Sequence, residues 1–228
     1  MLLFILITVG TMGLSLFAAS RVKANFAKYS QVANMRGMSG AEAAAHMLSS
    51  AGVRDVEIVA QEGLLGDHYD PRHKRLVLSN ENFHGRSVAA VGIAAHEAGH
   101  AIQHATNYAP LNLRMAAVGV TSFASSIVMW LPIIGMITGM FATSVGFGIM
   151  AIGWGIIMAF NLVTLPVEFD ATKRAKAALT TSGMILPTEK EGVDKVLDAA
   201  AWTYVAAFIT SLAYMIYYLL PLLAGGRE

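Results

Sequence analysis

The sequence contains no cysteine, which excludes disulfide bonds, thiolate metal ligands and a thiol nucleophile. Charged residues are scarce as well, because they make up 14% of the 228 residues, about half the share in an ordinary soluble domain. The net charge is only +1, so there is no basic surplus for binding nucleic acid. Hydrophobic residues account for 55% of the chain. This balance favours a protein that is built into a membrane.

Charge is missing altogether from one long internal stretch. Residues 115–167 contain no Lys, Arg, Asp or Glu, a run of 53 residues. At about 20 residues per crossing, such a run fits two membrane helices joined by a short turn. We therefore expect a transmembrane hairpin over 115–165, with its bend at Pro132 and Gly135 or near Gly139.

Two further uncharged stretches lie at the two ends of the chain. No basic residue precedes the first, so we expect a transmembrane anchor helix over 1–20 rather than a cleaved signal peptide. The second, 199–224, contains five Trp and Tyr residues that suit the membrane interfaces, and it is expected to form a fourth span.

Four spans place the two charged segments, 21–114 and 166–198, on the same side of the membrane. Arg21, Lys23 and Lys28 directly follow the first span, whereas almost no basic residue flanks the outer ends of the spans. Basic residues are retained on the inner side, so both charged segments are expected in the cytoplasm. The lipid bilayer is thus the first expected partner.

Local patterns predict a small α+β portion within the first charged segment. Ser39 and Glu42 have the spacing of a capping box, and Gly52 is placed to end the helix that follows. Two short segments have the residue types of strands, and Ser87 can cap a long Ala-rich helix. The expected elements are a helix over 39–50, strands over 55–60 and 75–79, and a helix over 87–104.

The segment His96-Glu-Ala-Gly-His100 carries the pattern H-E-x-x-H inside the last of these helices. Residues four apart lie one turn above each other on one helix face, so two imidazoles can converge on one zinc ion. Glu97 is turned about 100° from His96, which suits a carboxylate that contacts the metal-bound water without binding the metal. We expect His96 and His100 as zinc ligands and Glu97 as the general base. The alternative is a helix whose polar residues line a solvated face or form a satisfied cluster within the membrane.

A catalytic zinc ion needs a third protein ligand and an open position for water. His104 lies one turn beyond His100, but three helical residues spanning about 12 Å cannot all reach one ion, so His104 is expected to support a ligand or face the substrate. Glu168 is the strongest candidate, because the hairpin returns this first charge to the side that carries His96. Asp170 is the fallback ligand, or a hydrogen-bond partner that fixes the tautomer of a ligating histidine. The other candidates are His68, His73 and His84.

Glu168 also has two structural explanations that need no metal. It follows Pro166 closely, so it is placed to begin a helix, where the macrodipole favours a negative charge. It also stands where the uncharged stretch ends, and so it can mark the membrane boundary. These explanations compete with the role of a ligand.

Several strings of residues accompany the H-E-x-x-H motif: Lys28-Tyr-Ser30, Gly66-Asp-His-Tyr-Asp-Pro71, Ala94-Ala-His-Glu-Ala-Gly-His-Ala-Ile-Gln-His104, Tyr108-Ala-Pro110, Pro166-Val-Glu-Phe-Asp-Ala171 and Ala200-Ala-Trp-Thr-Tyr204. Together they resemble the YugP-type membrane-integral neutral zinc metallopeptidases of bacteria, over nearly the whole chain. The resemblance implies a multi-pass protein of the bacterial cell membrane with a gluzincin-like site. The third ligand of such a site is a glutamate on a later helix, and Glu168 is the matching position. More distantly, the chain resembles membrane proteases related to the CAAX prenyl protease, which usually carry an aspartate four residues after the glutamate; this sequence has Thr172 there.

The segment 63–79 has two interpretations. In gluzincin-like folds an edge strand beside the active-site helix pairs with the extended substrate, so this segment is expected to border the substrate groove. His68 or Tyr69 would then stabilise the oxyanion of the tetrahedral intermediate. The alternative is an Asx-type turn, in which Asp70 precedes Pro71 for conformational reasons alone.

The expected fold is a mainly α integral membrane protein with four transmembrane helices and a small α+β zincin-like catalytic portion. The expected function is that of a metalloendopeptidase with one Zn²⁺ per chain, which hydrolyses peptide bonds of membrane or membrane-adjacent proteins. Two alternatives stay open. The same zinc chemistry can cleave a non-peptide acyl bond such as a lipid amide, and the histidines and carboxylates can store, sense or transport a metal without catalysis.

Overall fold

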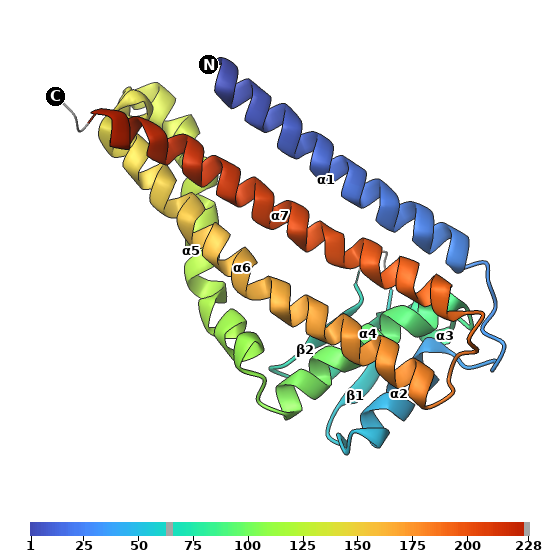
Figure 1. Ribbon diagram of the computed structural model, residues 1–228. Helices are drawn as coiled ribbons and strands as arrows, with labels where there is room; N and C mark the ends of the chain where they lie inside the picture. The colour runs from blue at the N-terminus through green and yellow to red at the C-terminus, as the bar shows by residue number, and fades with distance from the viewer. Residues whose placement is uncertain (63–65, 226–228) are drawn as a thin grey trace. The chain divides into compact units, whose positions relative to one another are not determined.

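The computed structural model describes residues 1–62 and 66–225, and most of them are helical (Figure 1). The helices are α1 (Leu2–Tyr29), α2 (Gly40–Ser50), α3 (Asn80–His84), α4 (Val88–Ala105), α5 (Ala109–Thr138), α6 (Ser144–Thr181) and α7 (Lys190–Gly225), with a 3-10 turn at Met140–Ala142. The strands are β1 (Glu57–Gln61), β2 (His68–Asp70) and β3 (Arg75–Ser79).

Four of the described helices, α1, α5, α6 and α7, are long and apolar enough to cross a membrane. The expectation of a mainly α protein with four such helices and a small sheet is therefore confirmed. The ends of the helices differ from the expected ends of the spans. The helix α1 continues past residue 20 to Tyr29, and α7 already begins at Lys190. A charged residue ends an apolar stretch of the sequence, but the hydrogen-bonded backbone of the helix can continue beyond that residue.

The helix α6 also continues where a break was expected. It runs from Ser144 to Thr181 with Pro166 inside it, so Glu168 lies within a helix and does not begin one. The explanation of Glu168 as a helix start is therefore wrong. Proline removes one helical hydrogen bond, and long membrane helices tolerate this loss where neighbouring groups satisfy the freed backbone.

The chain divides into two compact units. The apolar unit contains residues 1–17, 113–165 and the last helix from Thr203 onward. Its interior is formed by Leu131 of α5, Met150 and Ala151 of α6 and Tyr218 of α7. The polar unit contains Ala18–Asn112 and Pro166–Trp202, and every candidate site residue belongs to it.

The bend between α5 and α6 lies at Gly139, one of the two expected places. Gly139 has a φ of 75°, a left-handed conformation that favours glycine because it has no Cβ. Shortly after it, the hydroxyl of Thr143 accepts a hydrogen bond from the Gly146 N–H at 3.1 Å, which caps the new helix. Pro132, the other expected place, lies inside α5.

The predicted capping box of α2 is present. The Ser39 hydroxyl accepts a hydrogen bond from the Glu42 N–H, and the Glu42 carboxylate accepts one from the Ser39 N–H at 2.7 Å. Ser87 caps α4 through a hydrogen bond from the Ala90 N–H. The two helices therefore begin where the sequence places them.

The sheet has the strand order β1-β3-β2. β1 pairs with β3 in parallel, and β2 pairs with β3 antiparallel, with His68 opposite Val77. β2 and the short helix α3 were not predicted. Three residues are too few to show the alternation of a strand, and β2 is stabilised by its antiparallel hydrogen bonds to β3 across a short turn.

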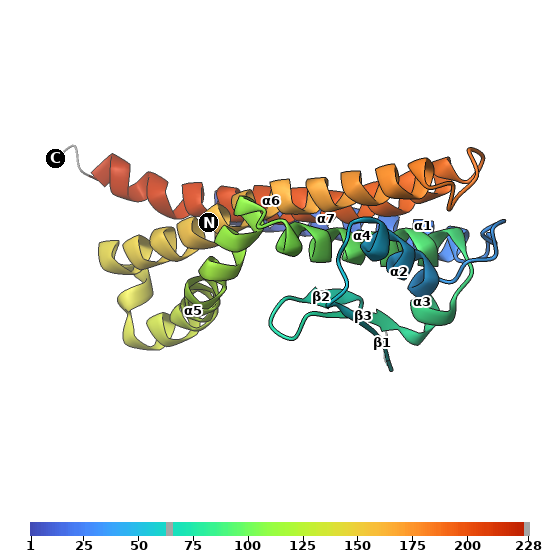
Figure 2. The same ribbon diagram turned by 90° about the horizontal axis from the view of Figure 1, so that it is seen from below.

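The core of the polar unit is formed by this sheet, by α2 and α4, and by the polar parts of α6 and α7. Figure 2 shows the three strands together on one side of α2 and α4. Leu76 and Leu78 of β3 are fully buried there, and α2 and α4 contribute mainly alanines to the same cluster. Small side chains let the helices approach closely, which fixes the position of α4.

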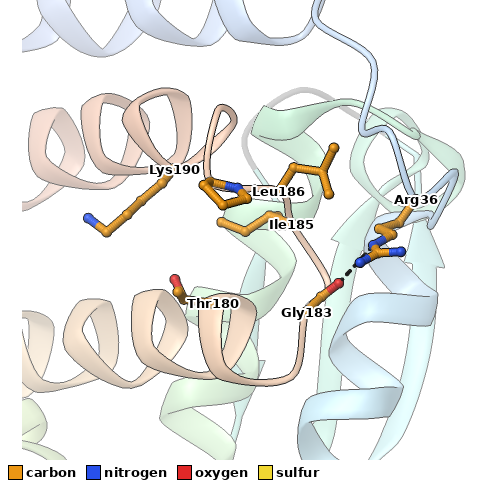
Figure 3. A pocket seen from close by; sticks show the side chains of 7 residues that line it. Arg36, Thr180, Gly183, Ile185, Leu186 and Lys190 are labelled. Atoms are coloured by element: carbon orange, nitrogen blue, oxygen red, sulfur yellow. Dashed lines mark hydrogen bonds between the residues drawn. The ribbon is translucent and has the colours of Figure 1, made fainter.

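The segment between α1 and α2 is fastened to the turn between α6 and α7. Three hydrogen bonds do this: Asn34 Nδ2 donates to the Met184 carbonyl at 3.2 Å, the Met35 N–H to Glu189 Oε1 at 2.7 Å, and Arg36 Nε to the Gly183 carbonyl at 3.0 Å. Beside the last of them lies a pocket of about 190 Å³ (Figure 3). It is lined by Arg36, Thr180, Gly183, Ile185, Leu186, Pro187 and Lys190. These hydrogen bonds join the two chain segments that make up the polar unit.

Candidate metal centre

The site is built where α4 packs against the polar part of α6. The two helices come close together at Gly99, the residue just before His100. A Cβ at Gly99 would lie 2.9 Å from the carbonyl oxygen of Ala171 and 3.2 Å from its Cα. Only glycine permits this approach, so Gly99 lets the backbone of α6 come next to the H-E-x-x-H face.

Three side chains converge at this contact. His96 Nε2 lies 3.2 Å from Glu168 Oε2, and His100 Nε2 lies 3.5 Å from the same oxygen. The metal-binding atoms of all three residues lie within 4.8 Å of one another. In a tetrahedral zinc site with bonds of about 2.0–2.1 Å, neighbouring ligand atoms are about 3.3 Å apart. The set therefore fits one metal ion, in the His, His, Glu combination that leaves a fourth position open.

The three side chains are almost completely buried. Exposure is 2% for the side chain of Glu168, 13% for His96 and 11% for His100. A buried carboxylate is stable only when it is paired or bound to a metal. Burial opposes a charge on His100, but the hydrogen bond to Glu168 and the nearby charge of Glu97 hold its pKa above the ordinary value. Electrostatics thus favour a positive charge at this place.

Each histidine uses its other ring nitrogen for a protein partner. His100 Nδ1 lies 3.0 Å from Gln103 Oε1, and His96 Nδ1 lies 3.2 Å from the hydroxyl of Thr172. Such partners orient ligating histidines and leave Nε2 for the metal. The role of Gln103 was not predicted. Its spacing of three residues from His100 places both on one helix face, but a sequence does not tell a buried amide from a solvated one.

The chain matches a protein family described as "Putative neutral zinc metallopeptidase" over residues 4–223. It belongs to this family. It is also 41% identical to the "Putative membrane protease YugP" of Bacillus subtilis (strain 168) over 227 residues, which cover 100% of both chains. No solved structure matches the chain. The family resemblance inferred from the sequence is confirmed.

Glu97 lies on α4 between the two histidines and is half-buried. It is close enough for its charge to raise the pKa of His100. Within residues 1–62 and 66–225, its carboxylate has no hydrogen bond or ion pair that would neutralise it.

Asp170 does not join the group of three. Its carboxylate accepts a hydrogen bond from Gln103 Nε2 at 2.8 Å and pairs with Arg174 at 2.5 Å. The expectation that Asp170 contacts a ligating histidine is therefore wrong, because Gln103 stands between Asp170 and His100. Thr172, four residues after Glu168, contacts His96 Nδ1 instead.

Tyr69 and His104 form a pair beside the site. The Tyr69 hydroxyl lies 2.9 Å from His104 Nδ1, which joins β2 to α4 one turn beyond His100. Burial raises the pKa of Tyr69 to about 12, so the phenol keeps its proton and can donate a hydrogen bond. His68 is exposed, and its ring contacts the Gly66 carbonyl of its own loop. Of the two candidates for oxyanion stabilisation, His68 and Tyr69, only Tyr69 contacts α4.

The other candidate residues lie apart from the metal centre. The carboxylate of Asp70 accepts hydrogen bonds from the Arg72 and His73 N–H groups, so the Asx-type turn is present. His73 is exposed and pairs with Asp70, and His84 ends α3. Residues 63–65, part of the segment expected at the substrate groove, lie outside the described residues.

Proposed function

We propose that this protein is a zinc-dependent endopeptidase that hydrolyses peptide bonds of membrane or membrane-adjacent proteins. One Zn²⁺ per chain would be held by His96, His100 and Glu168. The observation that carries the proposal is the convergence of two Nε2 atoms on one buried carboxylate oxygen, at 3.2 and 3.5 Å. Membership of the metallopeptidase family supports it.

The chemistry is divided between the metal and the side chains. A zinc ion held by these residues supplies Lewis acidity, which polarises a carbonyl group and lowers the pKa of a water molecule. Glu97 accepts the proton of the attacking water and delivers it to the leaving amine. Tyr69 donates a hydrogen bond to the oxygen that becomes negative in the tetrahedral intermediate.

The strand β2 supports an extended peptide as the substrate. It is one of the two edge strands of the described sheet, and it is the one whose Tyr69 contacts α4. An extended peptide can add to such an edge through main-chain hydrogen bonds. A lipid amide has no peptide backbone to pair in this way, so the sheet favours the peptide.

The sequence around Glu168 supports a substrate at the membrane. Glu168 is the first charged residue after 53 uncharged ones, on a helix that is apolar enough to span a bilayer. Arg21, Lys23 and Lys28 follow the apolar part of α1, so by the distribution of basic residues the polar unit would lie in the cytoplasm. Substrates would then be cleaved on the cytoplasmic side of the bacterial membrane.

The test compares detergent-purified wild-type protein with Glu97→Gln. We expect one zinc per chain in both, measured by atomic emission, and cleavage of β-casein at least about 100-fold slower in the variant. Equal cleavage by both proteins would disprove the role of Glu97. Zinc in both without cleavage by either would favour a metal-handling protein or a restricted substrate, and no zinc in the wild type would remove the basis of the proposal.

A further inference from the structure

Gln103 is a buried amide at the contact of α4 with α6. Its exposure is 0%, although it is polar and lies on a helix rich in alanine. Its oxygen Oε1 lies 3.0 Å from His100 Nδ1. Its nitrogen Nε2 donates two hydrogen bonds, one to the Val167 carbonyl and one to Asp170 Oδ2, both at 2.8 Å. Every strong hydrogen-bonding atom of the amide is therefore engaged.

These partners fix the orientation of the amide. The Val167 carbonyl and the Asp170 carboxylate both accept hydrogen bonds, so the NH₂ end must face them. A flipped amide would point its buried oxygen at two acceptors and leave it without a donor, which is unfavourable. Arg174 Nε donates to the same Asp170 oxygen at 2.5 Å, so this oxygen accepts hydrogen bonds from both side chains.

The fixed amide in turn selects one tautomer of His100. Because Gln103 Oε1 can only accept, the hydrogen bond requires a proton on His100 Nδ1. A neutral imidazole has one such proton, so its lone pair is then on Nε2, the atom 3.5 Å from Glu168 Oε2. His96 lacks this constraint, since the Thr172 hydroxyl can both donate and accept.

The same amide also holds the helix that carries the third member of the cluster. Val167 directly precedes Glu168, and Asp170 follows it by two residues, so Gln103 binds α6 on both sides of Glu168. One side chain thus sets the tautomer of His100 and the position of Glu168 together.

We propose that Gln103 is a positioning residue of the metal centre: it presents His100 Nε2 to the metal and holds Glu168 opposite it. The inference rests on the proposed zinc site. Its predicted consequence is that loss of the amide weakens zinc binding about 10- to 100-fold without removing any ligand.

The experiment uses the full chain in detergent and three variants. Gln103→Leu removes the acceptor and both donors. Gln103→Glu keeps an acceptor for His100 Nδ1. Tyr108→Phe is the control, because the Tyr108 hydroxyl donates to the Pro166 carbonyl of α6 at 3.5 Å without contacting a histidine of the cluster.

Zinc affinity is measured by competition with a chelator. The His100 tautomer is measured by ¹⁵N-histidine NMR of the metal-free protein over a pH series that extends until the His100 imidazole is neutral. We expect a His100 Nδ1 proton in the wild type, in Tyr108→Phe and in Gln103→Glu, and a mixture of tautomers in Gln103→Leu. The zinc Kd should rise about 10- to 100-fold in Gln103→Leu, rise less in Gln103→Glu, and stay within about twofold in the control.

Two results would overturn the role of Gln103. One is a wild-type Kd and tautomer in Gln103→Leu. The other is a result in which both Gln103 variants lose zinc affinity equally, keep the His100 tautomer of the wild type, and show the same fall in the melting temperature of the metal-free protein. That combination would indicate a purely structural residue. If the wild type binds no zinc, the proposed function fails, and the tautomer of the metal-free protein still decides whether Gln103 positions His100.

Discussion

Gly99→Ala should weaken zinc binding although Gly99 is not a ligand of the metal centre. The new Cβ would lie 2.9 Å from the Ala171 carbonyl oxygen, about 0.5 Å short of the 3.4 Å at which ordinary contact begins. The atom that it meets is backbone, so α4 and α6 must separate by a similar distance. Overpacking of this kind costs about 1–3 kcal/mol, and the better helix propensity of alanine offsets up to about 1 kcal/mol of it.

The separation of α4 and α6 should affect zinc affinity more than folding stability. His96 and His100 lie on one helix and Glu168 on the other, and a metal site tolerates displacements of only about 0.2 Å in its bonds. We therefore expect the zinc Kd of Gly99→Ala to rise at least about tenfold, measured by chelator competition, with a smaller loss of stability in the metal-free protein.

The matched control is Gly92→Ala on the same helix. There the new Cβ would lie 3.7 Å from Val193 Cγ1, an ordinary contact, so zinc affinity should stay at the wild-type value. The variant gains the same helix propensity as Gly99→Ala. If both variants bound zinc as tightly as the wild type, the close approach at Gly99 would not be what sets the site.

Three further predictions concern the ligands, the oxyanion and the metal. Glu168→Ala should lower zinc affinity by more than about 100-fold, because it removes a ligand rather than its support; full zinc content in this variant would move the third ligand to Asp170 or a histidine. Tyr69→Phe should keep its zinc and lower kcat about 100-fold with little change in KM, and unchanged steady-state kinetics on β-casein would remove the hydroxyl from the mechanism. Removal of zinc with a chelator should lower the melting temperature, and re-addition at 100 times the Kd should restore about 2.7 kcal/mol of stability; a melting temperature independent of zinc would argue against binding to the folded state.

Features that depend on neighbouring residues could be predicted from the sequence. The four apolar stretches and the capping box at Ser39 each depend on a few adjacent residues, so the sequence predicts them. For the bend of the hairpin the sequence offered two places, and the structure has it at Gly139. The H-E-x-x-H motif belongs with them, because the helical repeat alone puts His96 and His100 on one face.

Long-range contacts were decided by the tertiary structure. The course of α6 through Pro166 contradicted the local rule that proline starts or breaks a helix. The expected contact of Asp170 with a histidine is replaced by one with Gln103, because the distance between α4 and α6 decides which side chains meet.

The sequence by itself determined which residue types are available: two histidines one turn apart, an acid after a charge-free hairpin, and four helices suited to a membrane. The tertiary structure decided which of the acids meets the histidines and what orients them. The physical reason is that a helical repeat is local, whereas the packing of α4 on α6 depends on the absence of a single Cβ at Gly99 and on a buried amide at Gln103.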